Sequence, residues 1–242
     1  MSQDLKKLFA AVIEEEKKKR NAEIRALQYK INPHFLYNTL ASIRFLALKQ
    51  NSNEVSDIIL LLGKLLKNTI SKDSFLIPVC EEIQNIKDYL SIEQLCYDNR
   101  IKIGYNIDDS VLSYKLPLML LEPIVENAIM HGLNERINNN QAPEILISAF
   151  EQNDYICFEV RDNGIGMTKE QIDNILYDQA DESKYRGVHI GIKNTYNRII
   201  SHFGNRYGIT ITSEPGSYTI VKLKLPKISG EERSTDAQSA HS

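Results

Sequence analysis

The chain lacks three features that would each place a protein in a particular class: a long apolar run, an excess of positive charge and a cysteine pattern. It has no stretch of about 18 apolar residues and no signal-peptide pattern, so the sequence as given predicts a soluble, cytoplasmic piece. The net charge of -3 leaves no electrostatic footprint for nucleic acid. The three cysteines have neither metal-ligand spacing nor a pairing pattern, which is typical of a reducing compartment.

The chain does have enough apolar sequence for a folded core. Of its 242 residues, 42% are apolar and 25% are charged, a composition that fits one or two domains. Residues 4–50 are predicted to form one long helix, stabilised by i,i+4 pairs such as Glu14 with Lys18. Its first part, residues 1–20, is expected to be a coiled-coil linker. The basic run at 17–20 is either a solvated helix face or a stretch just inside a membrane.

Residues 32–38 (NPHFLYN) place a histidine directly after a proline within this predicted helix. Because Pro33 cannot donate a backbone hydrogen bond, it should bend the helix there. The apolar positions 36, 40, 43 and 47 share one helix face, and His34 points roughly 150° away from it. A lone histidine of this kind is most often a plain surface residue, but this position also suits a group that must meet another macromolecule.

A second amphipathic helix is predicted over residues 54–70, after a turn at 51–53. Two antiparallel helices with narrow apolar seams cannot bury both seams alone, whereas two copies can bury them in a four-helix bundle. We therefore expect a homodimer. A third helix over 81–97 and a strand over 100–107 follow.

The remaining sequence predicts an α+β sandwich, in which a mixed sheet carries helices on one face. A helix should begin at Pro117, because proline suits the first helical position. Its polar face would carry Glu122, Glu126, Asn127 and His131. The other expected elements are strands over 144–151 and 155–161, a polar loop over 163–189, a helix over 190–203, and strands over 207–213 and 218–225.

Three short motifs carry the chemistry. Residues 162–167 (DNGIGM) end a strand with a carboxylate that can accept from an exocyclic amine and with glycines that let the backbone approach a ligand. In residues 187–194 (GVHIGIKN), glycines precede a predicted helix start, and the N-terminus of a helix favours phosphate binding. The Asn127 amide can ligate Mg²⁺, Glu126 can orient a water, and His131 can reach a phosphate or cap the helix. Each motif alone also occurs in ordinary turns and caps.

Together and in this order, the motifs resemble the N, G1 and G2 boxes of the GHKL ATPase superfamily, and residues 213–219 (SEPGSYT) resemble its last glycine box. The resemblance implies the Bergerat α/β sandwich fold, with ATP and Mg²⁺ bound. Asn127 would hold Mg²⁺, Asp162 would contact the adenine amine, and residues 168–189 would form the ATP lid. The implied ATP-binding set is Asn127, His131, Asp162, Gly164, Gly166, Met167, Gly187, Ile190, Gly191, Ile192, Lys193, Asn194 and Thr219.

Residues 28–43 (QYKINPHFLYNTLASI) and 121–128 (LEPIVENA) closely resemble the LytS/YesM type of sensor histidine kinase. This resemblance implies that His34 is the phosphoacceptor and that the phosphoryl group passes to an aspartate in the receiver domain of a response regulator. It also implies an upstream sensor or transmembrane region and a membrane anchor in the full-length protein. The expected division is a linker (1–20), dimerisation and histidine phosphotransfer helices (21–104), an ATP-binding domain (105–227) and a disordered tail (228–242).

The sequence departs from the family pattern at several positions. Phe35 follows His34 where many other histidine kinases carry an acid, so no adjacent general base is visible. Pro123 stands four residues before Asn127, where many relatives have Asn or Glu. The role that this polar side chain has in the relatives is expected to pass to Glu126 or Glu122. Met130 and His189 are further departures. Together with the missing acid, they motivate an alternative, an ATP-binding signalling scaffold without kinase activity. The histidine hairpin argues against a second alternative, a kinase acting on serine of a partner.

Overall fold

The computed structural model describes residues 33–70, 74–139, 141–177 and 190–229. The chain divides into two compact units, Met1–Ser71 and Lys72–Ser242, so the predicted domain boundary at residue 104 falls inside the second unit. The linker, the basic run and the helix expected before Pro33 lie outside the described residues, as does the tail from 230 onward.

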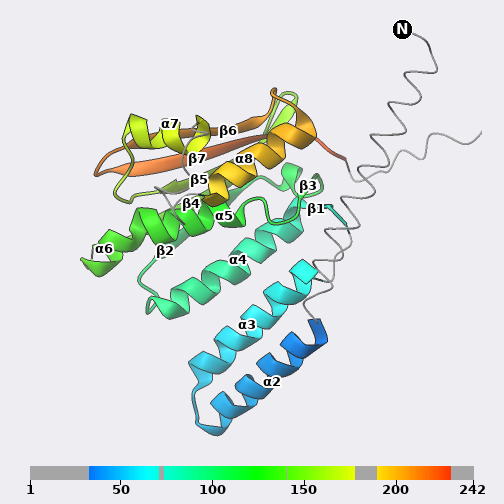
Figure 1. The fold of residues 1–242 in the computed structure, drawn as a ribbon, viewed down its shortest axis with the longest axis vertical. Coiled ribbons are helices and arrows are strands. Elements are labelled where there is room, and N and C mark those ends of the chain that lie inside the picture. The colour runs from blue at the N-terminus through cyan, green and yellow to red at the C-terminus, as the bar shows by residue number, and fades with distance from the viewer. Residues whose placement is uncertain (1–32, 71–73, 140, 178–189, 230–242) are drawn as a thin grey trace, which may run out of the picture. The chain divides into compact units, whose positions relative to one another are not determined.

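The described part of the first unit is a helical hairpin, as predicted (Figure 1). Helix α2 is described over Pro33–Lys49, so the bend predicted at Pro33 lies at the edge of the described residues. Helix α3 is Asn53–Ile70. The two helices pack closely at Gly63 of α3, where an added Cβ would lie 3.9 Å from Cδ1 of Leu40 on α2.

The hairpin leaves much of its apolar surface exposed. Of the predicted apolar stripe on α2, Ala47 is buried but Ile43 is 44% exposed. Eight large apolar side chains of the hairpin are at least 40% exposed: Phe35, Ile43, Phe45, Leu46, Leu48, Val55, Leu60 and Leu62. A helical pair of this kind needs a further surface to cover it.

The second unit contains a five-stranded mixed sheet with the order β2-β4-β5-β7-β6. Strand β2 pairs with β4 in parallel, and the other three pairings are antiparallel. Its strands are β2 (Lys102–Ile107), β4 (Glu144–Gln152), β5 (Tyr155–Asp162), β6 (Gly208–Glu214) and β7 (Tyr218–Pro226). A separate two-stranded sheet pairs β1 (Leu76–Pro78) with β3 (Lys115–Pro117).

Helices cover one face of the five-stranded sheet, which confirms the α+β class. On β4, Ile145, Ile147 and Ala149 are buried, whereas Leu146 between them is 38% exposed. The opposite face is therefore open to solvent. The helices are α4 (Val79–Cys96), the short turn η1 (Asp109–Val111), α5 (Glu122–Asn127), the π-helical turn η2 (Ala128–Leu133), α6 (Asn134–Asn138), α7 (Lys169–Tyr177) and α8 (Ile190–Phe203).

The prediction that a helix begins at Pro117 is wrong. Pro117 ends β3 opposite Leu76, and the N–H of Leu118 donates to the carbonyl of Phe75 at 3.1 Å. Helix α5 begins instead at Glu122, with Pro123 in its first turn. Proline suits both a helix start and the end of an edge strand, and only the distant partner strand decides between them.

The stretch 163–189 is not all loop, because α7 occupies residues 169–177. Thr168 and Gln171 form a capping box: the N–H of Thr168 donates to Oε1 of Gln171 at 2.7 Å, and the N–H of Gln171 donates to Oγ1 of Thr168 at 3.3 Å. The sequence signal for this helix was therefore present.

The buried sheet face makes a prediction about stability. Phe158 on β5 is fully buried, so Phe158→Ala should lower the free energy of unfolding by about 3–5 kcal/mol through lost contacts and a cavity. Chemical denaturation measures this. The matched control is Thr210→Ala on β6, whose side chain is exposed and whose loss should change stability by less than about 0.5 kcal/mol. Equal effects of the two substitutions would refute the assigned faces.

Candidate functional site

A buried carboxylate lies at the end of β5. Asp162 is 3% exposed and pairs in register with Thr219 of β7, which is 4% exposed. The N–H of Gly164 donates to Oδ1 of Asp162 at 2.9 Å. Burial raises the pKa of Asp162 to about 6, although the Gly164 hydrogen bond acts in the opposite direction. The group is therefore ionised at neutral pH and can accept a hydrogen bond from a ligand.

Three glycines let the backbone close around this carboxylate. A Cβ on Gly132 would lie 2.7 Å from Oδ1 of Asp162, and one on Gly164 would lie 2.0 Å from the carbonyl oxygen of Gly132. Gly166 has φ +66°, and its Cβ would lie 2.0 Å from the carbonyl oxygen of Glu214. No side chain fits at these positions, so the site is built from close backbone approach. Gly132 was not among the predicted residues, although a glycine inside a helical pattern was a visible signal.

The first serine of the last glycine box, Ser213, joins two predicted site residues. The N–H of Met167 donates to Oγ of Ser213 at 2.8 Å. That Oγ also lies 2.7 Å from the carbonyl oxygen of Tyr218 and 2.9 Å from Oγ1 of Thr219. Ser213 belongs to the predicted glycine box but was given no role of its own, because its contact with Met167 bridges segments far apart in the sequence. Met167 and Thr219 are thus fixed beside Asp162.

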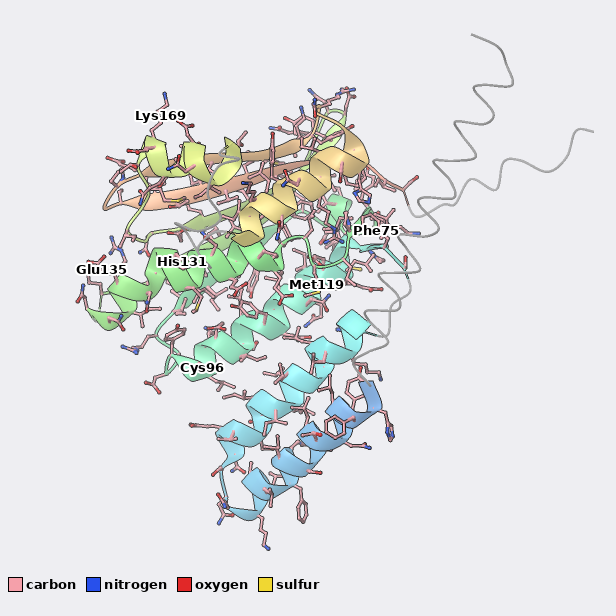
Figure 2. All side chains as sticks on the ribbon, in the orientation of Figure 1. Phe75, Cys96, Met119, His131, Glu135 and Lys169 are labelled. Atoms are coloured by element: carbon pink, nitrogen blue, oxygen red, sulfur yellow. The ribbon has the colours of Figure 1, made fainter. Side chains whose placement is uncertain are left out.

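Helix α5 and the turn η2 bring the predicted metal ligand to the same unit. Asn127 ends α5 and is 9% exposed, whereas the neighbouring Glu126 is exposed. His131, labelled in Figure 2, is half-buried in η2. Such π-helical turns are frequent at functional sites. Glu122 is half-buried; burial raises its pKa, and the nearby acids Glu82 and Glu126 raise it further.

The start of α8 packs against the start of α5. A Cβ on Gly191 would lie 2.9 Å from Cβ of Pro123, so this close approach requires glycine at position 191. Ile192 is fully buried, Lys193 is half-buried and Asn194 is exposed. Ile190 begins the helix. Of the predicted lid (168–189), residues 169–177 form α7, whereas residues 178–189, with Gly187 and His189, lie outside the described residues.

The residues present fit a nucleotide with Mg²⁺. Within the described residues, no group of three or more His, Cys, Asp or Glu side chains could hold a metal by itself. Mg²⁺ usually takes one or two protein oxygens and completes its shell with phosphates and water, which agrees with a single amide oxygen at Asn127. Glycine backbone surrounds Asp162 closely, so its buried carboxylate is the polar group that a nucleotide base would contact.

The first unit carries the predicted phosphoacceptor. His34 is exposed, and the side-chain amide nitrogen of Asn38 lies 3.2 Å from its Nδ1. Asn38 thus contacts the histidine ring from one helical turn away. His34 belongs to the first compact unit, and all other described site residues belong to the second.

Two family models match the chain: histidine kinase over residues 22–101, and histidine kinase-, DNA gyrase B- and HSP90-like ATPase over residues 115–229. Sensor histidine kinase YesM of Bacillus subtilis is 33% identical over 207 residues, which are 86% of this chain and 34% of YesM. Sensor histidine kinase BtsS of Escherichia coli K12 is 29% identical over 205 residues, 85% of this chain and 33% of BtsS. Sensor protein LytS of Bacillus anthracis is 28% identical over 239 residues, 96% of this chain and 40% of LytS.

Solved structures are similar as well. The histidine kinase domain of a blue-light activated kinase from Erythrobacter litoralis has a TM-score of 0.47 at 14% identity and covers 87% of this chain and 96% of that chain. The catalytic domain of histidine kinase ThkA has a TM-score of 0.48 at 15% identity and covers 63% of this chain and 95% of that chain.

The mixed sheet, the buried aspartate and the matched ATPase model define a GHKL-type domain. With the preceding helical region, the chain belongs to the histidine kinase family. It spans about a third of the length of YesM and BtsS. Among the helices that the structure describes, none is both long and apolar enough to cross a membrane.

The raised pKa of Asp162 predicts a pH dependence of stability. The pKa of Asp162 is about 6 in the folded state and 3.8 ordinarily, so the folded state binds this proton more tightly. The resulting contribution to the free energy of unfolding is fully present below pH 3.8 and is lost as the pH rises through 6. Between about pH 4.5 and 7.5, wild type should lose about 2 kcal/mol of unfolding free energy relative to Asp162→Asn. Urea unfolding at both pH values measures it. Asp173→Asn, at an exposed position on α7, is the control and should track wild type.

Proposed function

We propose that the chain is the cytoplasmic catalytic portion of a two-component sensor histidine kinase. It uses Mg-ATP to phosphorylate His34 and passes the phosphoryl group to an aspartate of a response-regulator receiver domain. The observation that carries the proposal is the buried Asp162, enclosed by glycine backbone, in the same chain as an exposed histidine on a helical hairpin. The first group suits a purine base and the second suits a macromolecular phosphate acceptor.

In the proposed ATP site, Asp162 accepts a hydrogen bond from the adenine amine, and Thr219 and Met167 lie beside it. The amide oxygen of Asn127 would hold Mg²⁺, which supplies charge neutralisation to the triphosphate when bound. Glu126, exposed next to Asn127, would orient a water bound to the metal. The N-terminal end of α8, with Lys193, favours the phosphates by its dipole and charge.

In the proposed transfer, Nε2 of His34 attacks the γ-phosphorus in line. The N–P bond forms as the bond from phosphorus to the bridging oxygen breaks, and ADP leaves with that electron pair. Attack through Nε2 needs the proton of the neutral ring on Nδ1, so the Asn38 amide, whose nitrogen lies 3.2 Å from Nδ1, would turn its oxygen toward that atom to orient the imidazole. Because phosphoryl transfer depends chiefly on positioning and charge stabilisation, the missing acid after His34 does not exclude catalysis.

The proposed enzyme is a homodimer with a sensor upstream. The eight exposed apolar side chains of the hairpin could be buried by a second hairpin in a four-helix bundle. The share of YesM and BtsS left uncovered, about two thirds, leaves room for a sensor and a membrane anchor in the full-length protein.

Labelling with γ-³²P-ATP and Mg²⁺ tests the acceptor. Wild type should gain label that is lost in acid and kept in alkali, and His34→Gln should gain none. His202→Gln, which removes an exposed histidine of the second unit, should be labelled like wild type. Nucleotide binding without label would favour the second candidate, the scaffold. The departure from the family pattern at Met130, which is 48% exposed in η2, motivates that candidate. Acid-stable label would indicate a serine kinase.

Asn127→Ala tests the metal role. Removing the amide oxygen should reduce the gain in ATP affinity that Mg²⁺ provides by roughly tenfold, a loss comparable to a charge-assisted contact. Calorimetric titration with Mg²⁺ and with EDTA gives this gain directly. Asn139→Ala, at an exposed position after α6, is the control. An unchanged gain in Asn127→Ala would place the metal elsewhere.

A further inference from the structure

A buried carboxylate outside the nucleotide motifs holds the chain just before α5. Glu82 of α4 is 1% exposed. Its Oε2 accepts the N–H of Met119 at 3.0 Å, and its Oε1 accepts those of Leu120 at 2.7 Å and Leu121 at 2.9 Å. Helix α5 has no side-chain cap of its own. Glu82 therefore supplies, from another helix, the acceptors that the entry to α5 lacks.

The loop that Glu82 holds has an uncommon backbone. Met119, labelled in Figure 2, has φ +57°, a region that side chains other than glycine seldom adopt. Without the carboxylate, the N–H groups of Met119, Leu120 and Leu121 would lose their acceptors, and burying unpaired amides is costly. The loop conformation therefore depends on Glu82.

The positive charge that faces Glu82 comes from α8. Burial raises the pKa of Glu82, whereas its three amide donors and the charge of Arg198 lower it. Burial lowers the pKa of Arg198, and Glu82 raises it in return. The Arg198 guanidinium also lies 5.1 Å from the ring centre of Phe75, which precedes β1. Glu82 thus lies where α4, the entry to α5 and α8 meet.

We propose that Glu82 is a positioning residue for the metal side of the ATP site. By holding the amides of residues 119–121, it sets where α5 begins and hence where Asn127, at the other end of that short helix, presents its amide oxygen. Arg198 supports this from the helix that follows the second glycine motif. The inference rests on the proposed function for the identity of the ligand.

Glu82→Gln tests the role, because glutamine keeps the shape but replaces one acceptor oxygen by an NH₂ group that faces N–H donors. ATP affinity is titrated with Mg²⁺ and with EDTA, and thermal unfolding is recorded alongside. We expect the affinity gain from Mg²⁺ to fall about tenfold while affinity in EDTA stays within about twofold. Glu135→Gln, at an exposed site on α6, should keep the wild-type gain. A merely structural role would lower thermal stability and leave the gain unchanged, which would overturn the inference.

A second pair of measurements covers a variant that fails to fold. In wild type, hydrogen exchange at the amides of residues 119–121 should be as slow as in α5, although they lie in a loop; fast exchange would overturn the inference. Arg198→Gln should also reduce the Mg²⁺ gain, and adding Glu82→Gln to it should cause little further loss. If Mg²⁺ does not increase the ATP affinity of wild type, the proposed function is overturned as well. If Mg²⁺ increases the ATP affinity of Glu82→Gln as much as that of wild type, the inference alone is overturned.

Discussion

The burial of Asp162 is the constraint on which the rest of the site depends. A carboxylate with 3% exposure tolerates few neighbours: they must be small, or they must donate hydrogen bonds. Gly132 and Gly164 both meet the first condition, since neither has room for a Cβ, and Gly164 also meets the second by donating its N–H. The carbonyl of Gly132 in turn accepts the N–H of Ile165 at 3.0 Å. The turn η2, the loop after β5 and the β6–β7 connection are thereby locked to one another around a single charged group.

The second unit contains two buried carboxylates with different surroundings. Glu82 accepts three backbone N–H groups within the protein and so holds a loop, although burial still raises its pKa. Asp162 receives one donor from the described residues, and its pKa is raised to about 6. A buried acid that is only partly satisfied costs stability at neutral pH, and a ligand donor can offset that cost. The difference in hydrogen bonding thus separates a positioning role from a binding role.

The elements with strong local periodicity could be predicted from the sequence. The helix predicted over 190–203 agrees with α8 at its C-terminal end, Phe203, because its apolar spacing and the following glycine are local signals. The strands β4 and β5 alternate clearly and were placed within one residue. Pro117 could not be assigned locally, since its strand pairs with residues about 40 positions earlier. The same limit explains why Glu82 was missed, since the amides that it accepts lie 37–39 residues away in the chain. It also explains why Ser213 was given no role of its own within the last glycine box, since Met167 lies 46 residues away.

The most direct test of the account is a crystal structure of the chain with Mg²⁺ and a non-hydrolysable ATP analogue. The account predicts the adenine amino group at about 3 Å from the carboxylate of Asp162. It also predicts Mg²⁺ at about 2.1 Å from the amide oxygen of Asn127. A nucleotide bound away from Asp162, or a metal held without Asn127, would contradict it.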